Sequence, residues 1–307
     1  MEEQLTDTIL MVRPAKFGYN EETAANNTFQ QSAEGADVDK IHLSALKEFD
    51  NFVETLRSHG VNVIVEEDTQ KPHKPDAIFP NNWLSLHQNG SIVTYPMYSP
   101  RRRKERREPI IERISDQFGF TRRYSLEQYE DEGLFLEGTG SMVLDRKNQI
   151  VYACLSDRTD PTVLDKFCAL MGYDRLLFIA MDKEGKTIYH TNVMMSIGDG
   201  FAVVCLDSIH NLDEKEELRR RLSESGKDII EIDLEQLYDF AGNILQVRSS
   251  MGESLIVMSK NAYRALRTTQ TEVLSRHGKI IHSTLDTIEK YGGGSARCMM
   301  AEVFTPR

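Results

Sequence analysis

A glycine-rich stretch near the end of the chain carries a cysteine of chemical interest. Three consecutive glycines at 292–294 are followed by Ser-Ala-Arg-Cys, which ends at Cys298. Such glycines allow backbone conformations and close approaches that a side chain forbids. A thiol presented on a tight turn beside Arg297 has the setting of a nucleophile. The alternative is a small buried hydrophobic residue, and only other parts of the sequence can decide between the two.

Two further residues complete a set that nucleophilic catalysis uses. His190, in Tyr-His-Thr-Asn, offers an imidazole that can accept and return protons. Glu137, in Glu-Gly-Thr-Gly-Ser, offers a carboxylate that can orient the base or bind substrate. Each motif has a structural alternative, because a lone histidine beside an apolar run is more often structural and Glu-Gly-Thr-Gly also suits a turn between strands.

A fourth polar segment runs from residue 75 to residue 83 and reads Pro-Asp-Ala-Ile-Phe-Pro-Asn-Asn-Trp. As local structure it is a turn, since Pro-Asp and Pro-Asn-Asn both favour turns. It also combines one carboxylate with two amides and the only tryptophan of the chain. Its candidates for contact with a substrate are Asp76, Phe79, Asn81 and Asn82.

A fold that brings these segments together must join positions far apart in the sequence. Short apolar runs predict strands and amphipathic stretches predict helices, in an order of strand, strand, helix, strand that recurs about every sixty residues. The prediction includes a helix at 104–118, a strand at 192–197 and a helix from 260 to 276. Five such units fit the 307 residues, and no Pro- or Ser-rich linker divides them, so we expect one domain over residues 1–307.

Small ββαβ units cannot bury their faces alone, and this favours a closed ring around a pseudo-fivefold axis. The predicted fold class is therefore α/β, a five-bladed α/β propeller, although an open α/β sheet would fit the same pattern. In a ring, the loops of all five units reach one central channel, where distant residues can meet.

The overall charge of −11 argues against nucleic acid or an anionic membrane surface as a partner. The local exception is the basic run at 101–107, which is typical of a solvated helix face or of an interface strip in a homo-oligomer. The four cysteines lack CxxC spacing, which disfavours a zinc site and a disulfide framework. We expect a cytoplasmic protein, because neither a signal peptide nor an apolar membrane span is recognisable.

Taken in order, these motifs resemble a known superfamily. Asp-x-x-Phe, Glu-Gly, His-x-Asn and a C-terminal Gly-Gly-Gly-x-x-Arg-Cys-Met are similar to the guanidine-modifying (pentein) enzymes, which include arginine deiminases, dimethylargininases and amidinotransferases. The segments at 156–159 (Ser-Asp-Arg-Thr) and 240–243 (Phe-Ala-Gly-Asn) also look like landmarks of that family. The resemblance covers almost the whole chain and implies a five-bladed propeller with the site on its axis.

The resemblance also implies roles for individual residues. Cys298 would attack the central carbon of a guanidino or ureido group, His190 would be the general acid and base, and Glu137 would bind substrate N–H groups. Asp76 would hold part of the head group, and Arg158 would pair with the carboxylate of an amino-acid substrate. The other implied substrate contacts are Phe79, Asn81, Asn82, Asn192 and Arg297. Neither a metal nor an organic cofactor is implied.

Three departures from the deiminase pattern point to the substrate. Asn81-Asn82 and Asn192 are amides where many relatives carry carboxylates, and Glu137-Gly-Thr lacks a following aspartate. An amide matches a neutral urea, whereas a buried guanidinium without carboxylates is costly. The closest resemblance is thus to a citrulline utilization hydrolase that releases ornithine, carbon dioxide and ammonia. The alternatives are an arginine deiminase or dihydrolase and, from another class, a non-catalytic binding protein of the same fold.

Overall fold

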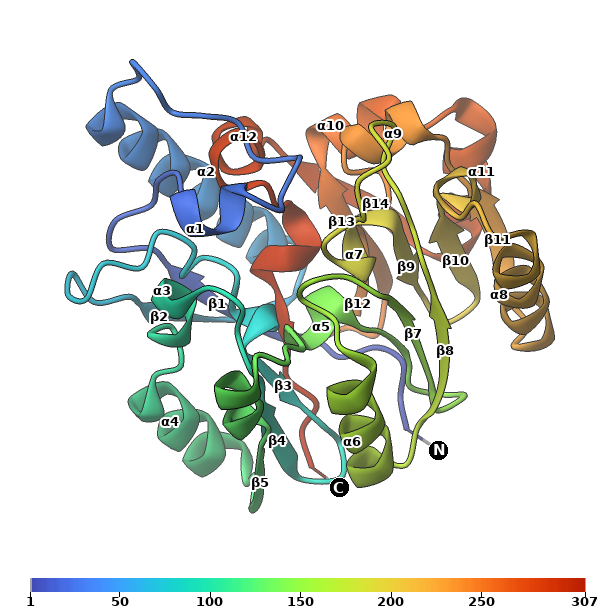
Figure 1. The fold of residues 1–307 in the computed structure, drawn as a ribbon, viewed down its shortest axis with the longest axis horizontal. Helices are drawn as coiled ribbons and strands as arrows, with labels where there is room; N and C mark the ends of the chain where they lie inside the picture. The colour runs from blue at the N-terminus through green and yellow to red at the C-terminus, as the bar shows by residue number, and fades with distance from the viewer. Residues whose placement is uncertain (1, 307) are drawn as a thin grey trace.

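The computed structural model describes residues 2–306, in which five three-stranded sheets form the framework (Figure 1). The first sheet contains β15 (Ala301–Glu302), β1 (Thr8–Arg13) and β2 (Asn62–Glu67). The second contains β3 (Leu84–Leu86), β4 (Ser91–Thr94) and β5 (Arg122–Ser125). The third contains β6 (Val143–Asp145), β7 (Ile150–Cys154) and β8 (Asp174–Phe178). The fourth contains β9 (Met195–Ile197), β10 (Phe201–Val204) and β11 (Asp228–Glu231), and the fifth β12 (Leu245–Arg248), β13 (Ser254–Ser259) and β14 (Lys279–Ser283).

Each sheet has the same internal order. The middle strand pairs antiparallel with one neighbour and parallel with the other. A parallel pair needs a crossover, and a helical segment supplies it in every sheet. These helices are α2 (Val38–Ser58), α4 (Glu108–Phe118), α6 (Pro161–Met171), α8 (Leu212–Glu224) and the pair α10 (Lys260–Ala265) and α11 (Thr268–His277). The ββαβ unit and the five-bladed α/β propeller predicted from the sequence are thereby confirmed.

The crossover helices begin and end where their sequences require. In α6, the Asp160 side chain accepts hydrogen bonds from the backbone N–H groups of Thr162 and Val163, and Pro161 occupies the first turn. Gly172 then ends the helix with φ of 76°. Helix α2 has an apolar face, with Phe49, Phe52 and other residues at helical spacing buried against the sheets.

The two ends of the chain meet in the first sheet. Strand β15 pairs antiparallel with β1, and the backbone N–H of Val303 donates to the carbonyl of Thr8 at 2.9 Å. The Thr6 hydroxyl adds a hydrogen bond of 2.6 Å to the carbonyl of Val303. The last strand of the chain therefore completes the first blade and closes the ring.

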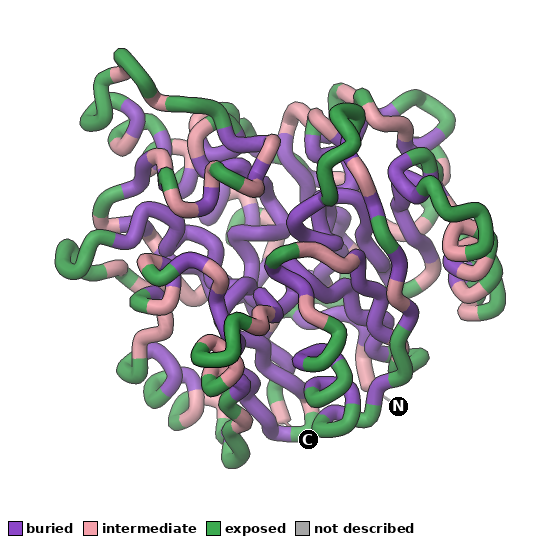
Figure 2. Tube along the Cα trace, viewed as in Figure 1, coloured by how far each residue is buried: buried purple, intermediate pink, exposed green. Residues whose placement is uncertain are grey.

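The segments that precede the first strand of each blade meet in the middle of the molecule (Figure 1). Four of them are single helical turns: η1 (Pro80–Asn82), α5 (Gly138–Ser141), α7 (Thr191–Met194) and η4 (Ala296–Met299). The fifth is the turn before β12, where Phe240 has φ of 60°. All four helical turns are buried, and Figure 2 shows buried backbone running through this central region. The remaining elements are α1 (Glu21–Ala24), α3 (Pro100–Arg103), η2 (Glu127–Glu132), η3 (Leu206–Ser208), α9 (Leu234–Tyr238) and α12 (Asp286–Gly292).

The three elements whose predicted bounds are given above differ from the structure in their extent. The helix predicted at 104–118 begins only at Glu108, because Pro109 suits a first turn but cannot donate within a helix. The strand predicted at 192–197 begins as helix α7, since an apolar run that is buried in either form does not distinguish the two. The helix predicted from 260 to 276 is divided at Leu266, whose ψ of 137° is extended.

None of the helices within residues 2–306 combines the length and the apolar character that a membrane crossing requires.

Candidate active site

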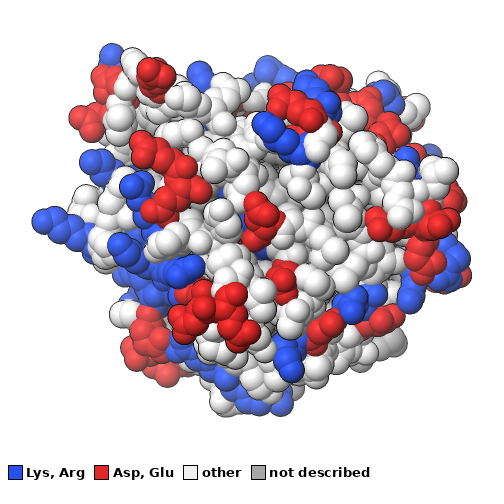
Figure 3. All heavy atoms as spheres, in the orientation of Figure 1, with Lys and Arg blue, Asp and Glu red and all other residues white. Residues whose placement is uncertain are grey.

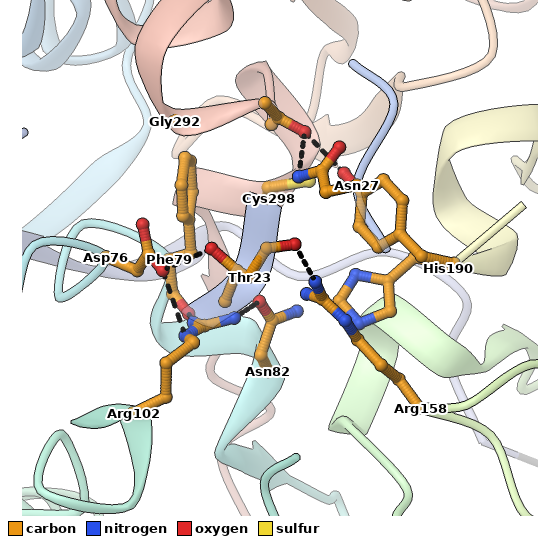
Figure 4. A pocket seen from close by; sticks show the side chains of 13 residues that line it. Thr23, Asn27, Asp76, Phe79, Asn82, Arg102, Arg158, His190, Gly292 and Cys298 are labelled. Atoms are coloured by element: carbon orange, nitrogen blue, oxygen red, sulfur yellow. Dashed lines mark hydrogen bonds and ion pairs between the residues drawn. The ribbon is translucent and has the colours of Figure 1, made fainter. Parts of the chain in front are cut away.

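A pocket at the centre of the ring collects side chains from four blades (Figure 4). Six of the residues selected from the sequence line it: Asp76, Phe79, Asn82, Arg158, His190 and Cys298. Glu137 contacts His190 and Asn192 contacts Cys298, so both lie directly behind the lining. The convergence of distant motifs expected for a ring is therefore observed in the structure.

The nucleophile candidate Cys298 lies in the helical turn η4 and is buried. Its Sγ accepts hydrogen bonds from two amides, Asn243 Nδ2 at 3.3 Å and Asn192 Nδ2 at 3.5 Å. Burial raises the pKa of the Cys298 thiol above its ordinary value, although the backbone at Ser295 and the two amides act in the opposite direction. The free site therefore holds this sulfur as a neutral thiol near pH 7.

The imidazole of His190 is held by Glu137. Nε2 of His190 lies 2.8 Å from Oε2 of Glu137. Burial lowers the pKa of His190 to about 4 despite this contact, so the ring is neutral near pH 7. Because a carboxylate only accepts, Nε2 carries the proton and Nδ1 is left with the lone pair that can take another.

Glu137 remains ionised in the interior because cations and donors surround it. Burial would raise its pKa, but Arg158, the hydrogen bond to His190 and Arg102 together lower the pKa below its ordinary value. Nη1 of Arg158 and Nη1 of Arg102 each lie 3.6 Å from Oε2, and the backbone N–H of Tyr98 donates to Oε1 at 3.0 Å. This carboxylate can orient the base and accept from a substrate N–H.

The glycines of the nucleophile loop are needed for close packing against Phe79. A Cβ on Gly292 would lie 2.9 Å from the Phe79 ring, and one on Gly294 would lie 3.1 Å from the same ring and 3.3 Å from Cβ of Cys298. Gly293 has φ of 64° and ends helix α12. The triple glycine therefore brings the loop that carries the thiol against an aromatic wall of the pocket.

Arg102 is a pocket residue that the sequence did not reveal. Its guanidinium is buried and forms a bidentate pair with Glu105, and Nη1 donates to Oδ1 of Asn82 at 2.9 Å. Nε lies 3.8 Å from Oδ2 of Asp76. The interpretation of the run at 101–107 as a solvated face or an interface strip is wrong for Arg102, because partners from other segments draw its head group inward.

The other arginines of the run do lie at the surface, but acidic groups accompany them. Arg101 pairs with Glu22, and both Arg103 and Arg106 pair with Glu130. Figure 3 shows basic side chains gathered at this edge of the molecule, near α3 and α4, with acidic side chains between them.

Arg158 faces the pocket as expected, but protein groups occupy its donors. Its Nε donates to Oδ1 of Asn26 at 3.0 Å, and Nη2 donates to the carbonyl of Thr23 at 3.0 Å. The guanidinium carbon lies 4.8 Å above the Tyr189 ring. The segment around α1 thus forms part of the site, with Thr23 and Asn27 in the pocket lining. This polar segment gave no sign of that position in the sequence.

Besides Asn192, which lies behind Cys298, two of the predicted substrate contacts do not line the pocket. Arg297 points away, because its guanidinium donates to the carbonyl of Met300 at 2.7 Å and pairs with Glu302 at 2.8 Å. Asn81 turns toward Thr139, to whose hydroxyl its Nδ2 donates at 3.2 Å. The expectation of a direct substrate contact is therefore corrected for Arg297 and for Asn81.

Asn243 lies beside the nucleophile, a position that the sequence did not predict. The sequence marked it only as a family landmark, whereas its Oδ1 accepts from the backbone N–H of Arg297 at 2.9 Å and its Nδ2 faces the sulfur. Within residues 2–306, the histidine, cysteine, aspartate and glutamate side chains form no group of three or more suited to a metal ion.

A five-bladed α/β propeller with cysteine, histidine and glutamate gathered at its axis is the arrangement of the guanidine-modifying pentein enzymes. Residues 13–305 match the family model described as N,N dimethylarginine dimethylhydrolase, eukaryotic, and the chain belongs to this family. It is thus an enzyme of the cysteine-dependent hydrolase class that acts on C–N bonds of guanidine-type groups. No match was found among curated proteins.

Solved structures share the fold at low sequence identity. The N-terminal domain of ArgZ, an arginine dihydrolase from cyanobacteria crystallised with its substrate, is 18% identical with a TM-score of 0.75, and the match covers 97% of this chain and 98% of that chain. AgrE in complex with ornithine and NAD+ gives a TM-score of 0.73 at 19% identity over 98% of this chain and 39% of that chain. Dimethylarginine dimethylaminohydrolase, as an adduct of a histidine-to-glycine variant with S-methyl-L-thiocitrulline, gives a TM-score of 0.64 at 15% identity over 97% of this chain and 99% of that chain.

Proposed function

We propose that this enzyme hydrolyses the ureido group of citrulline to ornithine, carbon dioxide and ammonia. One observation carries the proposal: two buried polar atoms of pocket residues have no hydrogen-bond partner, and they are of opposite kind. Asn82 Nδ2 is a donor, and Asp76 Oδ1 is an acceptor. Buried polar groups without a partner are costly, and a ligand that satisfies both gains that free energy.

A urea matches this pair of atoms better than a guanidinium does. Its carbonyl oxygen accepts a hydrogen bond while its N–H groups donate, whereas every polar atom of a guanidinium donates. Arg102 and Arg158 place two cations at the pocket, and the buried carboxylates of Asp76, Glu105 and Glu137 surround them. Glu105 is paired with Arg102, and Glu137 lies near both arginines, so Asp76 is the one carboxylate of the three with an oxygen left for a cationic substrate.

The side chains supply each step of the reaction. Cys298 Sγ attacks the ureido carbon after its proton passes to the imidazole of His190, which then protonates the departing Nδ of ornithine. The carbamoyl group that remains on the sulfur is attacked by water, with His190 as the base, and the thiol is regenerated. The released carbamate decomposes to carbon dioxide and ammonia, so one water is consumed per citrulline.

The remaining candidates bind rather than react. Asp76 Oδ1 accepts from a substrate N–H, Glu137 contacts the head group as well as His190, and Phe79 packs beside it. Arg158 is the partner for the α-carboxylate of the substrate. Its guanidinium can donate two parallel hydrogen bonds to a carboxylate when these replace its present hydrogen bonds to Asn26 and Thr23. Asn192, with Asn243, stabilises the sulfur as it becomes anionic.

A second candidate function is an arginine dihydrolase. The unpartnered Asp76 Oδ1 favours it, since burial raises the pKa of Asp76 and a cationic substrate would restore a charge partner. ArgZ, which shares the fold, is an arginine dihydrolase.

Substrate comparison separates the candidates. Purified enzyme is incubated with citrulline, arginine or dimethylarginine, and ornithine and ammonia are measured by chromatography and a coupled assay. We expect ornithine from citrulline at a kcat/KM at least about a hundredfold above that for arginine. Turnover of arginine with none of citrulline would refute the proposal. Wild-type activity in the Cys298→Ala protein would refute the nucleophile and favour a binding role for these residues.

The cellular setting and the partners are also proposals. All four cysteines are free and buried, which agrees with the reducing cytoplasm that the sequence led us to expect. The proposed partner is a free amino acid, and a homo-oligomer built on the surface arginines of the run at 101–107 stays a prediction.

A further inference from the structure

Arg102 is paired with Glu105 and also contacts Asn82 and Glu137 of the candidate active site. Glu105 fixes the guanidinium from behind, with Nε donating to Oε1 at 3.0 Å and Nη2 to Oε2 at 2.9 Å. Both side chains are almost completely buried, and Nη2 also donates to the carbonyl of Phe79 at 3.3 Å. The direction of the remaining nitrogen, Nη1, is thereby set by the fold.

Nη1 determines which end of an amide faces the substrate. It donates to Oδ1 of Asn82 at 2.9 Å. The oxygen and nitrogen of an amide have nearly the same shape, so the hydrogen-bond partners decide the orientation. Arginine can only donate, and therefore Oδ1 of Asn82 must face Arg102 and Nδ2 must face the other way.

The nitrogen of Asn82 is directed toward the reacting groups. A Cβ on Gly140 would lie 2.4 Å from Nδ2 of Asn82 and 2.7 Å from Nδ1 of His190, so both atoms border the same small space. Nδ2 is buried and has no partner in the protein. In Figure 4 the amide oxygen of Asn82 points to Arg102 and the nitrogen points to the side of Arg158 and His190.

We propose that Arg102, fixed by Glu105, is the positioning residue that makes the enzyme select a carbonyl oxygen, because it holds the Asn82 amide as a hydrogen-bond donor. The inference rests on the proposed ureido substrate and names the residue that determines its specificity. A guanidinium would face Nδ2 of Asn82 with an N–H of its own, which leaves two donors opposed. With Arg102 removed, the amide can rotate and offer Oδ1 instead.

Charge alone offers a rival explanation, because Arg102 would repel any cationic substrate. Arg158 provides the matched control. It is also a buried arginine of the pocket lining and lies at the same 3.6 Å from Glu137, but its donors go to Asn26 and Thr23 and not to Asn82. Replacing either arginine by methionine removes one positive charge, but only Arg102→Met releases the amide.

Binding is measured in a Cys298→Ser background, so that no chemistry intervenes. Dissociation constants for citrulline and for arginine are determined by calorimetry, and their ratio is compared between variants. Losses that both ligands share, such as contacts with the amino-acid end, cancel in this ratio. We expect Arg102→Met to reduce the preference for citrulline over arginine at least about tenfold. Arg158→Met should weaken the binding of both ligands but change the ratio of their dissociation constants by less than about threefold.

A buried glutamate without its partner can impair folding, so Arg102→Met/Glu105→Leu, which removes both charges, is measured in parallel. Thermal denaturation verifies that each variant is folded. An equal ratio change in the Arg102 and Arg158 variants would assign the effect to charge, and an unchanged ratio in the Arg102 variants would exclude positioning; either result overturns the proposal. The proposed function fails by a different result, namely tighter binding of arginine than of citrulline by the parent protein.

Discussion

Burial decides the protonation states of the reacting residues. The His190 imidazole, with a pKa of about 4, is neutral near pH 7, and the Cys298 thiol has a raised pKa. No thiolate–imidazolium pair is therefore preformed in the free site. The proton must leave sulfur during attack, and Nδ1 of His190 is the ring atom that can accept it.

The reactivity of Cys298 toward iodoacetamide should consequently increase with pH. A raised thiol pKa places the thiolate, which is the reactive form, above the ordinary value of about 8.5, so alkylation is slow near pH 7 and accelerates through that higher pKa. The rate is followed by mass spectrometry of the peptide that contains Cys298. The other cysteines serve as an internal control, because burial raises the pKa of Cys154 to about 12 and those of Cys168 and Cys205 to about 11. Rapid alkylation already at about pH 6 would instead reveal a preformed thiolate.

Asn82→Asp should shift the preference of the site toward arginine. The aspartate keeps an acceptor for Arg102 but replaces the donor at Nδ2 by a second acceptor, which opposes a ureido oxygen and suits a guanidinium N–H. We expect kcat/KM for citrulline to fall by about 10²-fold or more, and the ratio to arginine to fall further. Asn81→Asp is the matched control, since the neighbouring amide faces Thr139. Equal effects of the two substitutions would contradict the role of Asn82.

Individual side chains mark the limit of prediction from sequence. The chemistry of Cys298, His190 and Glu137 and their order along the chain predict a shared site, and the fold brings the three side chains together. The directions of the two arginines were not accessible. Arg297 adjoins the nucleophile yet turns to Glu302, and Arg102 belongs to a charged run yet is buried with Glu105, because the packing around each residue and not its type determines the direction of the head group.

At the scale of elements, the site depends on the short turns that precede the blades. Apolar periodicity predicted the recurring order of strand, strand, helix and strand, and the five sheets with their crossover helices have this order. The turns η1, α5, α7 and η4 were not predicted as helices, since four residues are too few for a periodic pattern. The triple glycine gave a true signal of a tight approach, but the partner, Phe79, lies more than two hundred positions away in the sequence.

Gly292→Ala should displace the loop that carries the nucleophile. The new Cβ would lie 2.9 Å from the Phe79 ring and 3.2 Å from the Phe17 ring, so a buried ring or the loop itself must shift. Overpacking of this kind costs about 1–3 kcal/mol, and we expect a lower Tm together with at least about a tenfold loss of kcat. Both are measured on the same preparation, by calorimetry and by ornithine release.

Gly18→Ala is the control for this substitution, because a Cβ there meets no atom within 4 Å. A Gly292→Ala enzyme as stable and active as the Gly18→Ala enzyme would show that the close approach to Phe79 is dispensable.

At the scale of the whole molecule, closure of the ring places the nucleophile. Cys298 precedes β15, which has no sheet of its own and joins the blade that β1 began. The hydrogen bonds of Val303 with Thr6 and Thr8 therefore hold the thiol opposite Glu137 and His190, which come from the middle of the chain. Stability and catalysis should depend on the same contact between the chain ends.

Removal of residues 301–307 should thus abolish activity and lower the Tm by at least roughly 10 °C, because Ala301, Val303 and Phe304 are buried and each large apolar side chain contributes about 1.5–3 kcal/mol. Removal of 305–307 alone keeps β15 and should change little.

The stronger test is a circular permutant that joins the ends by a short linker and opens the chain at Met251, in the exposed turn between β12 and β13. If the pairing of β15 with β1 is what matters, and not where the chain begins and ends, the permutant retains its Tm and its ornithine release. A permutant that is folded but inactive would contradict this role of ring closure.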